Sequence, residues 1–428
     1  MTDPASPAAP PSATHHLPVL DGVRGLAILL VMPSHFWGLA FGLSGRAPDN
    51  ALDRFLAHIF RSGWIGVDLF FVLSGFLISG ILLDARSSPF YFRNFYARRF
   101  LRIFPLYYGF LIVMLVLVPY SGFLSRVAAV DNLRANQWWY WTYTTNIGYA
   151  FTGLSFTGTF VQSQFWSLAV EEQFYLVWPA AVLLLRSQRL AALCVVLVFA
   201  SFGLRVYLAS DAASSFAAIN AAHVFTPARM DTFALGALLA IAARRGDALR
   251  DTARWAPYVA AAAFVVVAAL FVANDGLSVL DASVQTVGFT ALAFLFAAVL
   301  AITVTAAPGS VWRRIFSAAP LTWLGRYAYG LYVVHVFIAF FLADRILKLE
   351  WMRQIFLREA GGSQTPANIA TTVTGIAMSA AIAWLSWHLY ESQFLKLKRF
   401  VPYGGESSRI RSSEAPPSVS EQPTMSVP

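Results

Sequence analysis

The sequence contains ten apolar stretches that are long enough to cross a lipid bilayer as helices. They cover residues 22–43, 64–83, 105–122, 165–185, 190–209, 226–243, 256–274, 283–306, 324–343 and 367–389. A helix needs about 20 predominantly apolar residues to span the hydrocarbon core. The chain is 58% hydrophobic and only 12% charged, which lies outside the range of ordinary water-soluble domains. These features predict an all-α fold, a polytopic membrane helix bundle of about ten transmembrane helices.

The distribution of lysine and arginine predicts how these helices are oriented. Five arginines follow the second apolar stretch, and they are Arg86, Arg93, Arg98, Arg99 and Arg102. Because cytoplasmic loops carry an excess of lysine and arginine, we expect this loop on the cytoplasmic side. An even number of spans then places both termini in the cytoplasm, with about twice as many basic residues inside as outside.

We expect one membrane domain, residues 17–400, between two disordered cytoplasmic tails. Residues 1–16 are rich in Pro, Ala and Ser, and residues 401–428 are rich in Ser and Pro, so neither segment has enough apolar surface to fold. The formal net charge of +9 is better explained by loops that face anionic lipid than by nucleic-acid binding. Cys194 is the only cysteine, so thiolates cannot form a zinc site, and we predict no metal site.

Ionisable side chains in the first apolar stretch are the strongest candidates for a functional site. Asp21, Arg24 and His35 lie within LDGVRGLAILLVMPSHFW, where charged groups are costly unless they have a role. Arg24 and His35 are close to three helical turns apart, so they share one face at a separation of about 16 Å. This arrangement suits a site that holds a charged ligand and acts on its far end. In the alternative interpretation, Asp21 pairs with Arg24 at the membrane surface and His35 is a packing residue.

A pair of arginines precedes the third apolar stretch. Arg99 and Arg102 lie three residues apart in FYARRFLRIFP, and therefore on one helical face. Two guanidinium groups on one face can grip a phosphate through paired hydrogen bonds. The alternative is an anchor at the cytoplasmic surface, which is the role that we assign to Arg98.

Two glutamates lie inside the fourth apolar stretch, in QFWSLAVEEQFYLVWP. Glu171 and Tyr175 are four residues apart and face together, whereas Glu172 points about a quarter turn away. We therefore predict that Glu171 is the acid that faces inward, toward a cavity or a cation. Alternatively, Glu171 pairs with an arginine of another helix and orients the bundle.

Weaker signals are Asp68 in GWIGVDLFFVLSGFLISG, Arg229 and Asp231 in ARMDTFALGALLA, and Tyr329 and His335 in WLGRYAYGLYVVHVF. The two aspartates and Arg229 fit either buried pairs or a path for an acceptor. His335 also fits a hydrogen-bonded core residue. The predicted substrate-binding residues are Tyr175, Asp68, Asp231, Tyr329 and His335. The small residues of the second stretch predict close helix packing, and they are Gly63, Gly66, Ser74, Gly75, Ser79 and Gly80.

Taken together and in this order, the motifs resemble the acyltransferase 3 family of bacterial integral-membrane O-acyltransferases. The resemblance covers about residues 17–394. Members of this family modify lipopolysaccharide O-antigen, exopolysaccharide, peptidoglycan or macrolides. The resemblance implies a ten-helix core in the bacterial cytoplasmic (inner) membrane and no permanently bound cofactor. It also implies acyl-CoA, expected to be acetyl-CoA, as a co-substrate that enters from the cytoplasm, and an acceptor hydroxyl that is usually on a sugar.

The resemblance also places the family's site residues on this chain. The arginine and histidine of the first helix match Arg24 and His35. The paired arginines match Arg99 and Arg102, and the glutamate of the fourth stretch matches Glu171. We therefore expect an O-acyltransferase that moves an acyl group from acyl-CoA to a hydroxyl of a cell-envelope carbohydrate or lipid-linked glycan.

In the expected mechanism, Arg99 and Arg102 hold the phosphates of the donor while His35 removes the proton from the acceptor hydroxyl. A covalent acyl intermediate on His35 is the other route. Arg24, with Asp21, orients His35 or the donor, and Glu171, the fourth predicted catalytic residue, orients the acceptor. This mechanism requires His35 and the arginine pair to meet in one chamber. The alternative function is a transporter or flippase for an acyl group or a lipid-linked sugar, with the same buried charges as a relay.

Overall fold

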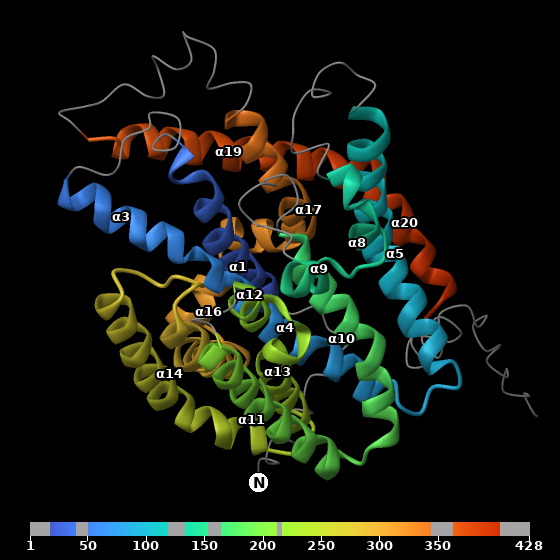
Figure 1. Ribbon diagram of the computed structural model, residues 1–428. Coiled ribbons are helices and arrows are strands. Elements are labelled where there is room, and N and C mark those ends of the chain that lie inside the picture. Colours follow the sequence, from blue (N-terminus) through green and yellow to red (C-terminus); the bar gives the residue numbers. More distant parts are fainter. Residues whose placement is uncertain are drawn as a thin grey trace, which may run out of the picture.

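The computed structural model describes residues 18–39, 50–118, 133–152, 164–211, 216–343 and 363–402, which form helices with no strand among them (Figure 1). The longer helices are α1 (Pro18–Phe36), α4 (Gly66–Asp84), α5 (Tyr91–Ile112), α10 (Phe165–Leu184), α11 (Ser187–Asp211), α14 (Ala248–Ala273), α15 (Phe289–Thr305), α17 (Ala319–Phe341) and α19 (Thr365–Ser386). The shorter ones include α3 (Ala51–Arg61), α8 (Gln137–Trp141), α9 (Thr145–Phe151), α12 (Phe216–Val224), α13 (Met230–Ala242), α16 (Val311–Phe316) and α20 (Ser392–Lys396).

Eight helical segments of the described chain are long and apolar enough to cross a membrane. The helices α12 and α13 are bent by 53° relative to each other and meet the same criteria only as a pair, which would be a ninth crossing if the pair forms one span. The remaining predicted stretch is α10, whose 20 residues include Glu171 and Glu172 and are therefore less apolar. The all-α polytopic membrane bundle is confirmed, although eight helices rather than ten qualify by apolar length alone. The predicted tails lie almost entirely outside the described residues, and the orientation stays a prediction.

Helices α1 and α17 approach each other closely because glycines replace side chains at their crossing. A Cβ atom added to Gly25 would lie 2.0 Å from the carbonyl oxygen of Leu321, and one added to Gly325 would lie 1.8 Å from that of Asp21. Small residues allow helix backbones in a membrane to pack at such short distances. The contact sets α1 alongside α17, so that side chains from both helices reach the same interior space.

Helix α4 lies at the centre of the bundle and packs against α1, α10, α13 and α15. Its contact with α13 uses one glycine from each helix. A Cβ atom at Gly75 would lie 2.2 Å from the carbonyl oxygen of Phe233, and one at Gly236 would lie 2.0 Å from that of Val72. The predicted close packing of the second apolar stretch is therefore confirmed at Gly75.

Four charged side chains form two buried ion pairs beside α4. Arg229 pairs with Asp68, and Arg205 Nη2 lies 2.7 Å from Asp231 Oδ2. Each of these residues is at most 1% exposed. The Arg205 guanidinium also donates to the carbonyl oxygen of Ala228 at 2.5 Å. Buried charges are tolerated when they are paired in this way, so these pairs fix α4, α11 and α13 relative to one another.

These pairs correct one part of the sequence interpretation. Asp68 and Asp231 were both predicted to bind substrate, but the structure commits their carboxylates to arginines within the protein. Neither aspartate lines the main cavity. The sequence left this choice open because helical periodicity places a side chain on a face without showing which neighbouring helix supplies its partner.

Candidate active site

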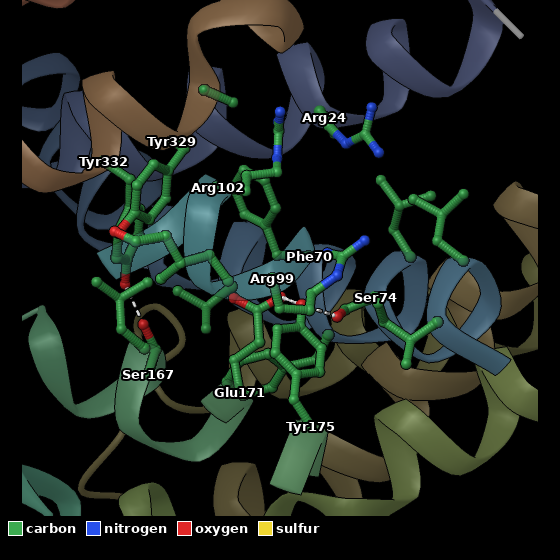
Figure 2. A pocket seen from close by; sticks show the side chains of 18 of the residues that line it. Arg24, Phe70, Ser74, Arg99, Arg102, Ser167, Glu171, Tyr175, Tyr329 and Tyr332 are labelled. Atoms are coloured by element: carbon green, nitrogen blue, oxygen red, sulfur yellow. Dashed lines mark hydrogen bonds between the residues drawn. The ribbon is translucent and has the colours of Figure 1, made fainter. Parts of the chain in front are cut away.

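A cavity opens between α1, α4, α5, α10 and α17, with about 1020 Å³ of empty space including its open part (Figure 2). Its lining includes residues of α4 from Val67 to Ile81, which corresponds to a length of about 21 Å at the helical rise per residue. The polar residues that line it are Arg24, Ser74, Arg99, Arg102, Ser167, Glu171, Tyr175, Tyr329 and Tyr332. The cavity is therefore long, largely apolar along α4, and polar on the opposite helices.

Three guanidinium groups face this cavity, from Arg24 on α1 and from Arg99 and Arg102 on α5. Arg24 Nη1 donates to Asp21 Oδ1 at 2.5 Å, which is the pair that the alternative interpretation of the sequence predicted, and Asp21 itself does not line the cavity. In the part of the chain that the structure describes, Arg99 and Arg102 have neither a hydrogen bond nor an ion pair. Arg99 Nε is buried without a partner. Unpaired guanidinium groups within a membrane bundle favour an anionic ligand.

The surroundings of the two α5 arginines limit how they can be satisfied by the protein. The Arg99 guanidinium lies over the ring of Tyr175, 5.6 Å from its centroid. Arg102 is within electrostatic reach of Arg24 and Arg99, and also of Glu391, but it forms no ion pair among the described residues. Like charges that share a cavity repel one another unless an anion lies between them. The predicted pairing of Arg99 and Arg102 on one face is confirmed by their position in the same cavity.

A row of polar side chains on α10 lines the opposite wall. Ser167, Glu171 and Tyr175 are spaced four residues apart and all face the cavity, as one helical face requires. The Tyr175 hydroxyl donates to Glu171 and lies 2.7 Å from Ser74 Oγ on α4. Glu171 is therefore the inward glutamate, as predicted, and Glu172 does not line the cavity. The hydrogen-bond partner of Glu171 is a tyrosine of its own helix rather than an arginine of another helix.

Ser167 on α10 and Tyr332 on α17 both line the cavity, and their hydroxyl groups are hydrogen-bonded to each other (Figure 2). The Tyr332 hydroxyl also lies 3.1 Å from the carbonyl oxygen of Gln164. The Gln164 side-chain amide in turn donates to the carbonyl oxygen of Val333 at 3.2 Å. These bonds tie the start of α10 to the middle of α17. The sequence interpretation missed Ser167, although its spacing from Glu171 places both on one face of α10.

The two histidines contact each other, and one of them also contacts Tyr332. The rings of His35 and His335 are edge to face, with their centroids 4.9 Å apart, and the His335 ring lies 5.5 Å from that of Tyr332. Neither histidine lines the cavity that contains the arginines. The expectation that His35 meets Arg99 and Arg102 in one chamber is therefore wrong for this cavity, whose lining includes Tyr332 but neither His35 nor His335. The contact of His335 with substrate stays a prediction.

Hydrogen bonds define the tautomer of both histidines. The Nδ1 atom of His35 lies 3.2 Å from the carbonyl oxygen of Val31, and Nδ1 of His335 lies 2.8 Å from that of Tyr332. A carbonyl oxygen can only accept, so Nδ1 carries the proton in each neutral ring and Nε2 has a free lone pair. His335 Nε2 is buried without a partner in the described chain. His35 is half-buried. Because its proton is on Nδ1, its Nε2 has the lone pair that a general base needs.

Tyr329 is the remaining residue with a predicted substrate contact. Its ring lines the cavity, while its hydroxyl donates to the carbonyl oxygen of Ile103 on α5 at 2.7 Å. The side chain can therefore shape the cavity wall, but its hydroxyl is already engaged. Of the predicted site residues, the cavity thus brings together Arg24, Arg99, Arg102, Glu171, Tyr175 and Tyr329.

Comparison with known proteins identifies the class to which this bundle belongs. The profile of the family described as the acyltransferase domain matches residues 17–388. This match covers most of the chain, so the chain belongs to the acyltransferase 3 family of multi-pass membrane proteins. No solved structure matches the chain significantly.

Individual relatives are similar to the chain at lower identity. The peptidoglycan O-acetyltransferase OatA of Listeria monocytogenes is 27% identical over 410 residues, which are 89% of this chain and 56% of the relative. The putative peptidoglycan O-acetyltransferase YrhL of Bacillus subtilis is 28% identical over 75% of this chain and 48% of its own length. The O-acetyltransferase OatA of Staphylococcus aureus is 26% identical, with coverages of 76% and 51%. The chain thus spans about half the length of these curated relatives.

Proposed function

We propose that the protein is an O-acetyltransferase that moves an acetyl group from acetyl-CoA to a hydroxyl of a cell-wall glycan. The observation that carries this proposal is the pair of guanidinium groups, Arg99 and Arg102, that face a long cavity without a hydrogen bond or ion pair among the described residues. Acetyl-CoA has the matching form, since it combines phosphates at one end with a slender arm that ends in the thioester. The glycan acceptor is suggested by relatives that are named as peptidoglycan O-acetyltransferases.

The donor is placed by charge and by shape. Its phosphates bind Arg99 and Arg102, where charge-assisted hydrogen bonds replace the repulsion between the two cations. Its arm then follows the apolar face of α4 toward Ser167 and Tyr332, which also line the cavity. Binding energy at the phosphates thereby positions a thioester that is remote from them.

The chemical step uses His35 as the general base. Its Nε2 accepts the proton of the acceptor hydroxyl while the hydroxyl oxygen attacks the thioester carbonyl carbon. The carbon–sulfur bond then breaks, and the departing CoA thiolate takes the proton from the imidazolium. Transfer by a covalent acyl group on His35 uses the same Nε2 atom and the same proton balance overall.

In this structure His35 does not line the donor cavity, and Tyr332, whose ring contacts His335, is hydrogen-bonded through its hydroxyl group to Ser167. The proposed reaction therefore requires that the two hydroxyl groups part when the thioester arrives. Such gating keeps water away from an activated acetyl group until the acceptor is present. Glu171 and Tyr175, which are hydrogen-bonded to each other beside this point, would orient the arriving arm.

The test is transfer of labelled acetyl groups by the purified protein. Wild type in detergent micelles, supplied with labelled acetyl-CoA and peptidoglycan fragments, should form labelled glycan ester and release an equal amount of CoA. His35→Ala should lower this rate on the order of a hundredfold or more. His388→Ala is the matched control, since this histidine is exposed and contacts the carbonyl oxygen of Trp384.

The outcomes separate the enzyme from the alternative function. Full activity of His35→Ala would remove this residue from the chemistry while leaving the donor site intact. If wild type released no CoA yet moved an acyl group or a lipid-linked sugar across vesicle membranes, the protein would be a transporter or flippase. Acetylation of the glycan fragments without added acetyl-CoA, detected by mass spectrometry, would overturn the donor assignment.

A further inference from the structure

The segment that follows α19 packs along the first half of α5, although the two are far apart in sequence. In Figure 1, α20 lies beside α5, and the two helices are in contact. The side-chain amide of Asn94 donates to the carbonyl oxygen of Pro402 at 2.6 Å, and the Arg98 guanidinium donates to that of Val401 at 3.2 Å. These bonds fix the end of the segment against the same helix that carries the arginine pair.

This packing brings Lys398 to the arginines. Lys398 is half-buried in the short helical turn Leu397–Phe400, which packs against α5, the helix of Arg98, Arg99 and Arg102. No carboxylate of the described chain forms an ion pair with it. Glu391 precedes it on the same segment, but that carboxylate is buried and accepts a hydrogen bond from Ser386 Oγ at 3.0 Å. Lys398 is therefore a basic side chain without an ion pair in the described chain, next to the helix that carries the arginines of the proposed donor site.

Lys398 differs from the two α5 arginines in its position relative to the cavity. Arg99 and Arg102 line the cavity, whereas Lys398 does not. Lys398 instead lies on the segment to which Arg98 donates a hydrogen bond. Arg98 itself lies one helical turn before Arg102 on α5. A ligand that enters past this segment with its thioester foremost would leave its outermost anionic group beside Lys398.

The phosphates of acyl-CoA have the same order. Two of them form the pyrophosphate between the arm and the adenosine, and the third is attached to the ribose at the end most distant from the thioester. If Arg99 and Arg102 hold the pyrophosphate, the ribose phosphate remains for a cation outside the cavity. A lysine suits this terminal group because its ammonium is a compact charge on a flexible stem.

We propose that Lys398 binds the ribose phosphate of the donor and makes the protein select CoA thioesters over dephospho-CoA thioesters. This inference rests on the proposed function, because it assumes that acetyl-CoA is the donor. A contact between an ammonium group and a phosphate that is partly exposed should change affinity about tenfold. The selectivity of wild type should therefore be about tenfold in the dissociation constant.

The experiment measures competition for labelled acetyl-CoA by unlabelled CoA and dephospho-CoA, which differ only in the ribose phosphate. Lys398→Gln should bind CoA about tenfold more weakly and dephospho-CoA as tightly as wild type. Lys398→Arg keeps the charge and should retain most of the selectivity. Lys396→Gln is the matched control, because Lys396 is exposed and donates to Gln393 Oε1 at 2.8 Å.

The results distinguish this inference from the function on which it rests. Equal weakening of both ligands by Lys398→Gln, or the same loss in Lys396→Gln, would reduce Lys398 to a general surface charge and overturn the inference alone. Equal affinity of wild type for the two ligands would also overturn it while leaving acetyl-CoA as the donor. Absence of saturable acetyl-CoA binding by wild type would overturn both the inference and the proposed function.

Discussion

Replacement of Arg102 by glutamine should have opposite effects on the empty and the liganded protein. In the empty protein, Arg102 is acted on more strongly by the cations Arg24 and Arg99 than by the carboxylates of Glu391 and Asp21. Removing its charge should therefore stabilise the empty protein by a few tenths to about 1 kcal/mol, as expected for partly exposed charges. The same change removes a charge-assisted contact with the donor, which is worth about 2 kcal/mol or a factor of roughly 30 in affinity.

The assay is thermal unfolding of the detergent-solubilised protein with and without CoA. At about 100 times the wild-type dissociation constant, CoA should stabilise wild type by about 2.7 kcal/mol. A dissociation constant raised about thirtyfold reduces this stabilisation in Arg102→Gln to about 0.9 kcal/mol. Arg102→Lys is the control, because it keeps the charge but loses the planar fork, and it should fall between the two.

The prediction can fail in two separate ways, because Arg102→Gln should raise stability without CoA and weaken the stabilisation by CoA. A variant that unfolds earlier than wild type without CoA would show that Arg102 is stabilised by the protein rather than left for a ligand. A full shift of the unfolding temperature by CoA in Arg102→Gln would remove the arginine pair from the donor site. Either result would refute the reasoning. A variant that is merely destabilised would not show the expected combination of higher stability without CoA and a smaller shift with CoA.

Three further predictions concern packing, charge and orientation. Asp68→Asn should lower stability by about 3–5 kcal/mol because it leaves Arg229 uncompensated, and addition of Arg229→Met should restore much of it; equal thermal unfolding of the single and double variants would contradict this. Gly75→Val should lower the free energy of unfolding by about 1–3 kcal/mol or more in the same assay, since its Cβ would lie 2.2 Å from a backbone oxygen of α13. The control Gly203→Ala should leave stability unchanged, because its Cβ would meet nothing within 4 Å. A cysteine introduced by Ser87→Cys, between α4 and α5, should react with an impermeant thiol reagent in inverted vesicles, and reaction in intact cells instead would reverse the orientation.

The sequence alone was sufficient for the class of fold and for the side chains that share one helix face. Apolar length determines a membrane bundle because a bilayer accepts only segments that satisfy their own backbone hydrogen bonds. Helical periodicity placed Arg99 beside Arg102, and Glu171 beside Tyr175, and the structure confirms that all four line one cavity. Such local arrangements depend only on the geometry of a single helix.

The contacts between helices were decided only by the tertiary structure. Asp68 and Arg229, which are 161 residues apart, pair with each other rather than with a ligand. His35 shares a face with Arg24 on α1, yet it contacts His335 of α17 and does not line the arginine cavity.

Lys398 reaches the arginine pair only because the segment after α19 folds back along α5. Periodicity gives the direction of a side chain, but packing between helices decides what it meets, since in a membrane that packing depends on the close fit of small residues and on paired polar groups.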